Sequence, residues 1–193
     1  MPRPHQKPKN RQARAGVAKA GGSLRQRLLR VRLLLCDVDG VLTDGTVQIG
    51  DGREFKSFHI QDGLGLRLLQ RAGVRVAWIS NRPSPATQQR ATELQIDFLH
   101  QAPGSKVKAA ESILDRAGLT WEDAAFVGDD LVDLGPMQRS GLAVAVANAI
   151  EDVKGLADYV TRAAGGHGAV REVVENILRA KDKWRQLLEA HLE

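Results

Sequence analysis

The sequence predicts an α/β fold, built on a doubly wound parallel sheet with helices on both faces. Two patterns carry this prediction. Short apolar runs bounded by Gly, Asp or Asn alternate along the chain with stretches whose apolar residues recur at helical spacing. Such alternation is typical of strand–helix–strand units, whose strands lie parallel in one sheet. The length of 193 residues and the hydrophobic content of 42% suit one globular domain that buries its core without disulfide bonds.

Five apolar runs are the expected strands. The first ends in Asp-Val-Asp-Gly, so a buried strand would deliver polar groups at its carboxyl end. In chain order the expected strands are Val31–Cys36, Val74–Ile79, Ile96–Leu99, Ala124–Val127 and Leu142–Val146. The helical patterns are Gly65–Arg71, Pro85–Leu94, Lys106–Ala117, Leu131–Arg139 and a long amphipathic helix over Ala169–Leu192.

One segment interrupts the alternation directly after the first strand. Thr46–Ile49 and Arg53–Phe58 flank the pair Asp51-Gly52, which favours a tight two-residue turn. We therefore expect a β-hairpin that projects from the sheet.

Charge divides the chain into two parts. Residues 1–36 contain ten Lys and Arg and no acidic residue, whereas the rest of the chain has 18 basic and 23 acidic residues. Residues 1–23 also combine Pro, Gly and small polar residues, so we expect a disordered basic tail there and one domain over residues 24–193. The tail permits a weak contact with nucleic acid. We do not favour that partner, because the body of the chain is acidic.

Composition also narrows the class of protein. No stretch approaches the roughly 18–20 apolar residues that a membrane-spanning helix needs, so we expect no membrane partner. Aromatic residues make up 4%, too few for a surface that stacks several bases. The single cysteine, Cys36, leaves no internal disulfide and fits a reducing, cytoplasmic location.

Two carboxylates follow the first expected strand. Asp37 and Asp39 stand two residues apart at the strand exit, and ligands of open α/β sheets bind beyond the carboxyl ends of the strands. One carboxylate of such a pair can attack an electrophile while the other donates or accepts a proton. By itself, Asp-x-Asp-Gly is equally typical of a solvated turn.

Three further groups reduce the weight of that simpler explanation. Ser80 ends the second expected strand with a hydroxyl, and Lys106 opens a helix with a positive charge. Asp129 and Asp130 end the fourth strand, and paired carboxylates suit Mg²⁺, which prefers hard oxygen ligands. Asp133 follows them, and we expect it on a helix surface or behind the metal ligands. Along the chain, the strand ends thus carry first a candidate nucleophile, then a hydroxyl, then a lysine and last an acidic pair.

That order resembles the haloacid-dehalogenase-like phosphatase superfamily, and the resemblance is closest to its 3-deoxy-D-manno-octulosonate 8-phosphate phosphatase family. The motifs that carry it are D-V-D-G-V-L-T-D-G, F-H-I-Q-D-G-L-G, G-D-D-L-V-D-L and D-Y-V-T-R-A-A-G-G-H-G-A-V-R-E, within roughly residues 31–180. The resemblance implies a Rossmann-like core with the hairpin in place of a cap domain. It also implies a Mg²⁺-dependent phosphomonoesterase, a sugar acid phosphate as substrate, and a homotetramer.

The resemblance also implies roles for individual residues. Asp37 would be the nucleophile and Asp39 the general acid and base. Ser80 and Lys106 would hold the phosphoryl oxygens. The Mg²⁺ ligands would be the Asp37 and Asp129 carboxylates and the Asp39 carbonyl. Asp130 would lie among or near the residues that contact these ligands. The family usually has Gly where this chain has Asn81, which leaves the placement of the following Arg82 open.

The substrate's organic part is expected to meet Asp62, Arg82 and Arg171. Asp62 could instead be a helix N-cap. The Gly165–Gly168 segment is expected to reach a neighbouring subunit's site. Three alternatives stay open: a phosphatase for nine-carbon 2-keto sugar acid phosphates, a non-catalytic nucleic-acid-binding protein that uses the basic tail, and a phosphosugar mutase. The mutase is the weakest, because mutases generally need an enclosing cap and the chain has no cap-sized insertion.

Overall fold

The computed structural model describes residues 22–192. Residues 1–21 lie outside this range, so the expected disorder of the basic tail and its contact with nucleic acid stay predictions. Within residues 22–192, no helix combines the length and the apolar character that crossing a bilayer requires.

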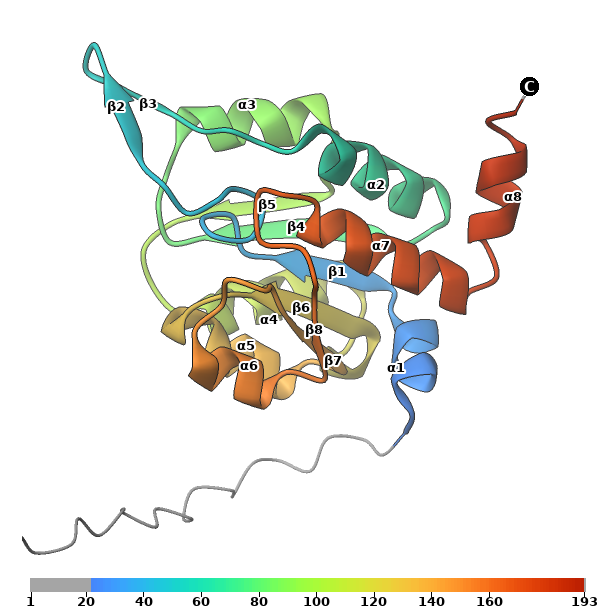
Figure 1. Ribbon diagram of the computed structural model, residues 1–193. Coiled ribbons are helices and arrows are strands. Elements are labelled where there is room, and N and C mark those ends of the chain that lie inside the picture. The colour runs from blue at the N-terminus through green and yellow to red at the C-terminus, as the bar shows by residue number, and fades with distance from the viewer. Residues whose placement is uncertain (1–21, 193) are drawn as a thin grey trace, which may run out of the picture.

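The core is a parallel sheet of six strands in the order β5-β4-β1-β6-β7-β8 (Figure 1). Their bounds are β1 (Leu33–Cys36), β4 (Arg75–Ser80), β5 (Phe98–Gln101), β6 (Ala124–Gly128), β7 (Leu142–Ala145) and β8 (Tyr159–Val160). Figure 1 shows α2, α3 and α7 on one side of the sheet and α4, α5 and α6 on the other. The predicted doubly wound α/β fold is confirmed.

Eight α-helices occur in the described residues. They are α1 (Leu24–Arg30), α2 (Ile60–Arg71), α3 (Pro85–Glu93), α4 (Lys106–Ala117), α5 (Leu134–Arg139), α6 (Glu151–Leu156), α7 (Ala169–Ala180) and α8 (Trp184–Glu189). Short 3₁₀ turns cover Trp121–Asp123 and Leu131–Asp133. Strand β1 lies at the centre of the sheet, paired with β4 and β6, and all four of its residues are buried. Helices on both faces explain why β1 is apolar throughout instead of alternating.

The expected hairpin consists of β2 (Gln48–Gly50) and β3 (Arg53–Phe55), paired antiparallel. Asp51 and Gly52 have φ of 52° and 70°, the positive values that a tight hairpin turn requires at both central positions. In Figure 1 the hairpin extends away from the sheet beyond α3. Its apolar side chains are exposed in the single chain, with Ile49 at 76%.

The expected long helix over Ala169–Leu192 is wrong. The chain leaves α7 at Ala180, adopts a left-handed conformation at Asp182 with φ of 56°, and starts α8 at Trp184. The break allows Trp184 to fold back against α7, where Arg171 and Arg179 lie over its ring at 5.1 and 5.0 Å. The apolar residues keep helical spacing across the break, so the sequence pattern did not reveal it.

Other elements differ in extent. The expected helix Leu131–Arg139 begins with a 3₁₀ turn, and α2 starts five residues before the expected Gly65. Helix α1, helix α6 and strand β8 were not predicted, because each is short and carries little apolar periodicity. Helix α1 is held in place by contacts distant in sequence: Arg27 donates a hydrogen bond to the Gly141 carbonyl and pairs with Asp158.

Candidate active site

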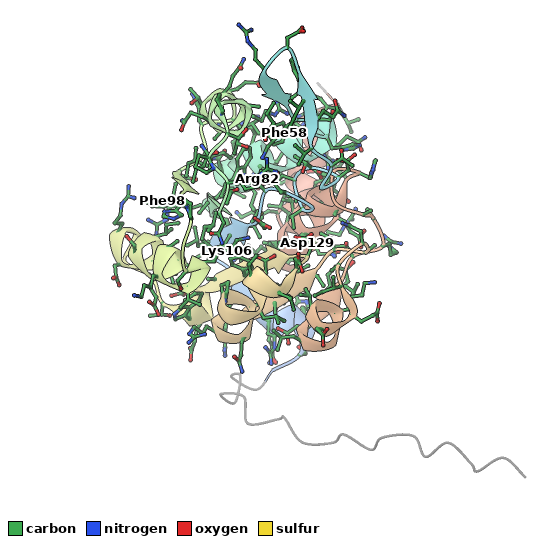
Figure 2. The ribbon with its side chains drawn as sticks, turned by 90° about the vertical axis from the view of Figure 1, so that its left-hand side faces the viewer. Phe58, Arg82, Phe98, Lys106 and Asp129 are labelled. Carbon is green, nitrogen blue, oxygen red and sulfur yellow. The ribbon has the colours of Figure 1, made fainter. Side chains whose placement is uncertain are left out.

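The polar groups gather where the direction of chain winding reverses. From β1 the chain proceeds outward through β4 and β5, then returns to β6 on the other side of β1 and continues outward through β7 and β8. Loops at the carboxyl ends of β1 and β6 therefore separate there and leave a crevice, the usual ligand position in open parallel sheets. In Figure 2, Lys106 and Asp129 face this region, and Arg82 and Phe58 lie above them toward the hairpin.

Asp37, Lys106 and Asp133 form a buried ion cluster. Lys106 Nζ lies 2.7 Å from Asp37 Oδ1 and 2.8 Å from Asp133 Oδ1. Asp37 and Lys106 are only 5% and 4% exposed, and Asp133 is fully buried. The ammonium thus bridges carboxylates from the ends of two neighbouring strands, which compensates charges that would otherwise be costly to bury.

Asp133 orders the loop that carries the acidic pair. Its Oδ2 accepts hydrogen bonds from the backbone amides of Asp129 and Asp130, at 3.0 and 3.3 Å. Two places were expected for Asp133, a helix surface or a position behind the metal ligands. The first is wrong, because the 3₁₀ turn Leu131–Asp133 directs the side chain inward, and the buried position against the loop of Asp129 fits the second. A Cβ on Gly128 would lie 2.5 Å from the Asp133 Cβ, so this close approach depends on glycine.

Asp129 completes an acidic group that can hold a metal ion. Carboxylate oxygens of Asp37, Asp129 and Asp133 all lie within 4.8 Å of one another. Asp129 Oδ1 is buried and has no hydrogen-bond partner within the described residues. An orphaned buried carboxylate oxygen among other carboxylates fits a hard divalent cation. Gly40, with φ of 93°, makes room, because a Cβ there would lie 2.0 Å from Asp129 Oδ2.

Burial gives these carboxyls unusual proton affinities. Burial, and to a smaller extent the negative charge of Asp133, raises the pKa of Asp37 to about 8, although the nearby Lys106 lowers it. Burial and then Asp133 likewise raise the pKa of Asp129 to about 7. Burial alone would lower the pKa of Lys106, but Asp37 and Asp133 raise it, so Lys106 stays charged. The site thus holds one cation and more acidic groups than it can balance, which is the electrostatic setting of a metal site.

Asp39 lies at the edge of the cluster, with a defined partner for each oxygen. Lys56 Nζ is 2.6 Å from Asp39 Oδ1, and Ser80 Oγ is 3.4 Å from Asp39 Oδ2. Ser80 is buried at the end of β4, as its place in the sequence predicted. Lys56 was missed. Glu54 and Lys56 are less exposed than Arg53 and Phe55, but polarity does not alternate over these four residues, so the sequence offered no local signal for a face turned toward the site.

Arg82 is next to the site but paired with the hairpin. Its guanidinium lies 2.5 Å from Glu54 Oε2, and its side chain is 46% exposed. Its backbone amide donates to Ser80 Oγ at 3.0 Å. The turn therefore forms with Asn81 in place of the family's usual Gly, and Arg82 extends over the crevice.

The other expected substrate and metal residues have structural partners. Asp62 is buried inside α2, so it is not an N-cap; its Oδ1 accepts a 2.6 Å hydrogen bond from the Arg171 amide, and burial raises its pKa. The Arg171 guanidinium pairs with Glu175 at 2.8 Å and lies over Trp184. Asp130 is exposed, and its carboxylate caps the Leu131 amide. The structure brings none of these three side chains into the ion cluster.

Within the Gly165–Gly168 segment, Gly165 and Gly166 pack on the loop after β1 of their own chain. The Gly166 amide donates to the Val41 carbonyl at 3.1 Å, and a Cβ on Gly165 would lie 1.8 Å from the Gly40 carbonyl oxygen. Asn148 bridges the two loops: it accepts from the Gly165 amide at 2.6 Å and donates to the Gly40 carbonyl at 3.1 Å. Glycine permits this close contact with the loop after β1. The expected reach of the segment to a neighbouring subunit stays a prediction.

Comparison with known proteins agrees with this geometry. Residues 95–173 match the family model described as haloacid dehalogenase-like hydrolase. The chain is 43% identical over 154 residues to the 3-deoxy-D-manno-octulosonate 8-phosphate phosphatase KdsC of Escherichia coli K12, covering 79% of this chain and 82% of that protein. The KdsC of Yersinia pestis is also 43% identical, over 82% of this chain and 85% of the relative.

Solved structures show the same similarity. The Y. pestis 3-deoxy-D-manno-octulosonate 8-phosphate phosphatase superposes with a TM-score of 0.82 at 42% identity, over 84% of this chain and 88% of that one. The Moraxella catarrhalis phosphatase of the same name, solved with a magnesium ion, a phosphate ion and a KDO molecule, has a TM-score of 0.85 at 36% identity, over 86% of this chain and 97% of that one.

Proposed function

The chain belongs to the 3-deoxy-D-manno-octulosonate 8-phosphate phosphatase family of haloacid dehalogenase-like hydrolases, and from this premise we propose how its residues hydrolyse the ester. The protein is a phosphatase that converts 3-deoxy-D-manno-octulosonate 8-phosphate to the free sugar acid and phosphate. The observation that carries the proposal is the buried cluster of Asp37, Lys106, Asp129 and Asp133 at the crevice of the sheet.

In the first step Asp37 is the nucleophile. Its carboxylate oxygen attacks phosphorus, the bond to the sugar oxygen breaks in line, and Asp39 gives its proton to that oxygen. Lys106 offsets negative charge on the phosphoryl group, and Ser80 donates to it from the end of β4. The positions of Lys106 and Ser80, both buried beside the two aspartates, support these roles.

In the second step the aspartyl phosphate is hydrolysed. Asp39, now ionised, takes a proton from water, and the water oxygen attacks phosphorus to release phosphate and regenerate Asp37. One carboxyl can serve both directions because it gives up its proton in the first step. Asp39 contacts Ser80 and Lys56, and these contacts support its place beside the reacting groups. Its carboxylate pairs with Lys56 and not with Lys106.

Mg²⁺ is the cofactor, and the residues present fit it. The proposed ligands are the carboxylates of Asp37 and Asp129 and the backbone carbonyl of Asp39, with Asp133 holding the Asp129 loop. Bound Mg²⁺ neutralises charge on the transferring phosphoryl oxygens. The unpartnered Asp129 Oδ1 and the raised pKa values of the Asp37 and Asp129 carboxyls support this assignment.

The activity is tested by phosphate release from 3-deoxy-D-manno-octulosonate 8-phosphate, from a nine-carbon 2-keto sugar acid 9-phosphate and from glucose 6-phosphate, each with Mg²⁺ and with EDTA. We expect the eight-carbon substrate to give the highest kcat/KM and EDTA to abolish turnover, with recovery on Mg²⁺ addition. The relatives support the eight-carbon substrate over the nine-carbon alternative. A clear preference for the nine-carbon ester, or full activity in EDTA, would contradict the proposal.

Stability is expected to depend on pH in the metal-free protein. Folding raises the pKa of Asp37 to about 8 and of Asp129 to about 7, so between about pH 4 and 8 the folded state binds more protons than the unfolded state. Stability should therefore fall as pH rises, with Tm in EDTA lower at pH 8 than at pH 6 by on the order of 5 °C. Mg²⁺ requires ionised ligands, so its stabilising effect should be larger at pH 8.

Asp129→Asn is the matched control for that experiment. The variant lacks one of the two raised carboxyls, so its Tm should vary less with pH and should respond little to Mg²⁺. Thermal denaturation followed by circular dichroism measures both. A metal-free Tm that rises from pH 6 to pH 8 would contradict the electrostatic description of the site.

A homotetramer and a cytoplasmic location are parts of the same proposal. Exposed apolar residues on the hairpin support subunit contacts there, since Val47, Ile49 and Phe55 are 48%, 76% and 52% exposed in the single chain. The buried, free Cys36 supports a reducing compartment. Light scattering should give four subunits for the full chain and a smaller assembly for Ile49→Glu. A monomeric wild-type protein with full activity would contradict the tetramer.

A further inference from the structure

We propose that Lys56 is a positioning residue, which holds the Asp39 carboxyl group in the orientation from which Asp39 protonates the departing oxygen of the substrate. The inference rests on the proposed function, because it assumes that Asp39 is the general acid. Lys56 is not among the residues that the sequence motifs indicated.

Lys56 contacts Asp39 directly. Lys56 Nζ is 2.6 Å from Asp39 Oδ1, and the Lys56 side chain is only 3% exposed. A buried ammonium needs a counter-charge, so this pairing is held more firmly than a surface ion pair. Ser80 Oγ meets the other oxygen at 3.4 Å, so the two contacts together define the rotation of the carboxylate.

Lys56 is itself held in place by neighbouring side chains. Its Nζ lies 3.7 Å from Glu54 Oε1, and Glu54 Oε2 lies 2.5 Å from Arg82, which follows β4. Two residues after Lys56, Phe58 stacks on Trp78 with ring centroids 6.0 Å apart and an angle of 10° between the planes. Trp78 is fully buried in β4, so the base of the hairpin is anchored to the strand that carries Ser80.

Asp39 needs such support because of its position in the fold. Asp39 lies in the loop after β1, its side chain is 23% exposed, and the next residue is Gly40 in a left-handed conformation. A partly exposed aspartate on a loop has several staggered side-chain conformations available, and only one orientation serves proton transfer. The segment that follows the hairpin, through Lys56, thus orients the acid.

The test compares two substrates whose leaving groups differ in their need for a proton, which separates proton donation from every other step. Benzyl phosphate and 4-nitrophenyl phosphate are similar in size, but benzyl alkoxide must be protonated as the P–O bond breaks, whereas 4-nitrophenolate leaves as a stable anion. We expect Lys56→Met to lower kcat/KM for benzyl phosphate by about 10- to 100-fold, and for 4-nitrophenyl phosphate by less than about 3-fold. Lys108→Met is the matched control, because Lys108 is exposed on α4, and it should leave both values unchanged.

Chemical rescue provides a second measurement. Lys56→Cys followed by alkylation with 2-bromoethylamine restores an ammonium at nearly the original distance, and we expect at least half of the lost benzyl phosphate activity to return. The native Cys36 is fully buried, and burial raises the pKa of its thiol, so Cys36 is protected from the reagent. The alkylation therefore takes place at the introduced thiol. The introduced thiol borders a cavity of about 640 Å³ between the hairpin and α3.

Each outcome decides the question. The positioning role of Lys56 would be overturned if Lys56→Met lost equal activity on both esters, if it lost none on either, or if alkylation gave no rescue. If the variant lost activity on the sugar acid phosphate alone, Lys56 would instead be a substrate contact. A wild-type protein that hydrolyses neither ester nor the sugar phosphate would overturn the proposed function, which is a separate failure.

Discussion

Replacing Asp37 by Asn is expected to lower turnover of 3-deoxy-D-manno-octulosonate 8-phosphate on the order of 10³-fold or more while the protein stays folded. The amide keeps the shape of the side chain, and its oxygen can still accept from the Val38 amide and from Lys106, which now meet Asp37 Oδ1 at 2.7 Å each. It cannot attack phosphorus. Steady-state phosphate release measures the loss, and circular dichroism verifies the fold.

The control for this variant is Asp44→Asn. Asp44 lies in the same loop but is exposed, and its carboxylate accepts from Thr46 within a turn, so its loss should leave turnover within about 3-fold of the wild type. A rapid acid quench should also trap a phosphorylated wild-type protein, and Asp37→Asn should not become labelled. A folded Asp37→Asn protein with near-normal turnover would exclude an aspartyl-phosphate mechanism at this position.

Replacing Lys106 by Met is expected to affect both activity and stability. Lys106 is the cation that bridges Asp37 and Asp133, and its removal leaves buried carboxylates without compensation. Breaking a buried ion cluster from one side costs about 3–5 kcal/mol, and loss of a charged group that stabilises the transition state lowers kcat by about 10²–10³-fold.

The dependence of that loss on pH identifies its cause. The pKa values of Asp37 and Asp129 are raised, so at pH 6 these carboxyls bind protons and need less compensation than at pH 8. The free energy lost by Lys106→Met, measured by urea denaturation in EDTA, should therefore be larger at pH 8. Lys108→Met removes an exposed lysine from the same helix and should cost little at either pH. An equal loss at both pH values would indicate lost packing alone.

The sequence by itself determined the alternating fold and the set of residues at the strand ends. Apolar runs bounded by Gly and Asp correspond to β1, β4, β6 and β7 because a strand covered on both faces has to be apolar throughout. The parallel arrangement then brings the polar ends together, which is why Asp37, Ser80, Lys106 and Asp129 could be predicted as one group before any distance was known.

Only the tertiary structure decided which side chains face one another. Lys56 reaches Asp39 across 17 residues and Asp133 turns inward to Lys106 across 27, whereas Arg171 turns away to Glu175 and Trp184. The expected long helix also ends at Ala180, and Trp184 packs back against Arg171 and Arg179 of α7. Local periodicity records which residues prefer burial, but the partner of a buried charge depends on which segments the fold brings together, and a single sequence does not contain that information in any local pattern.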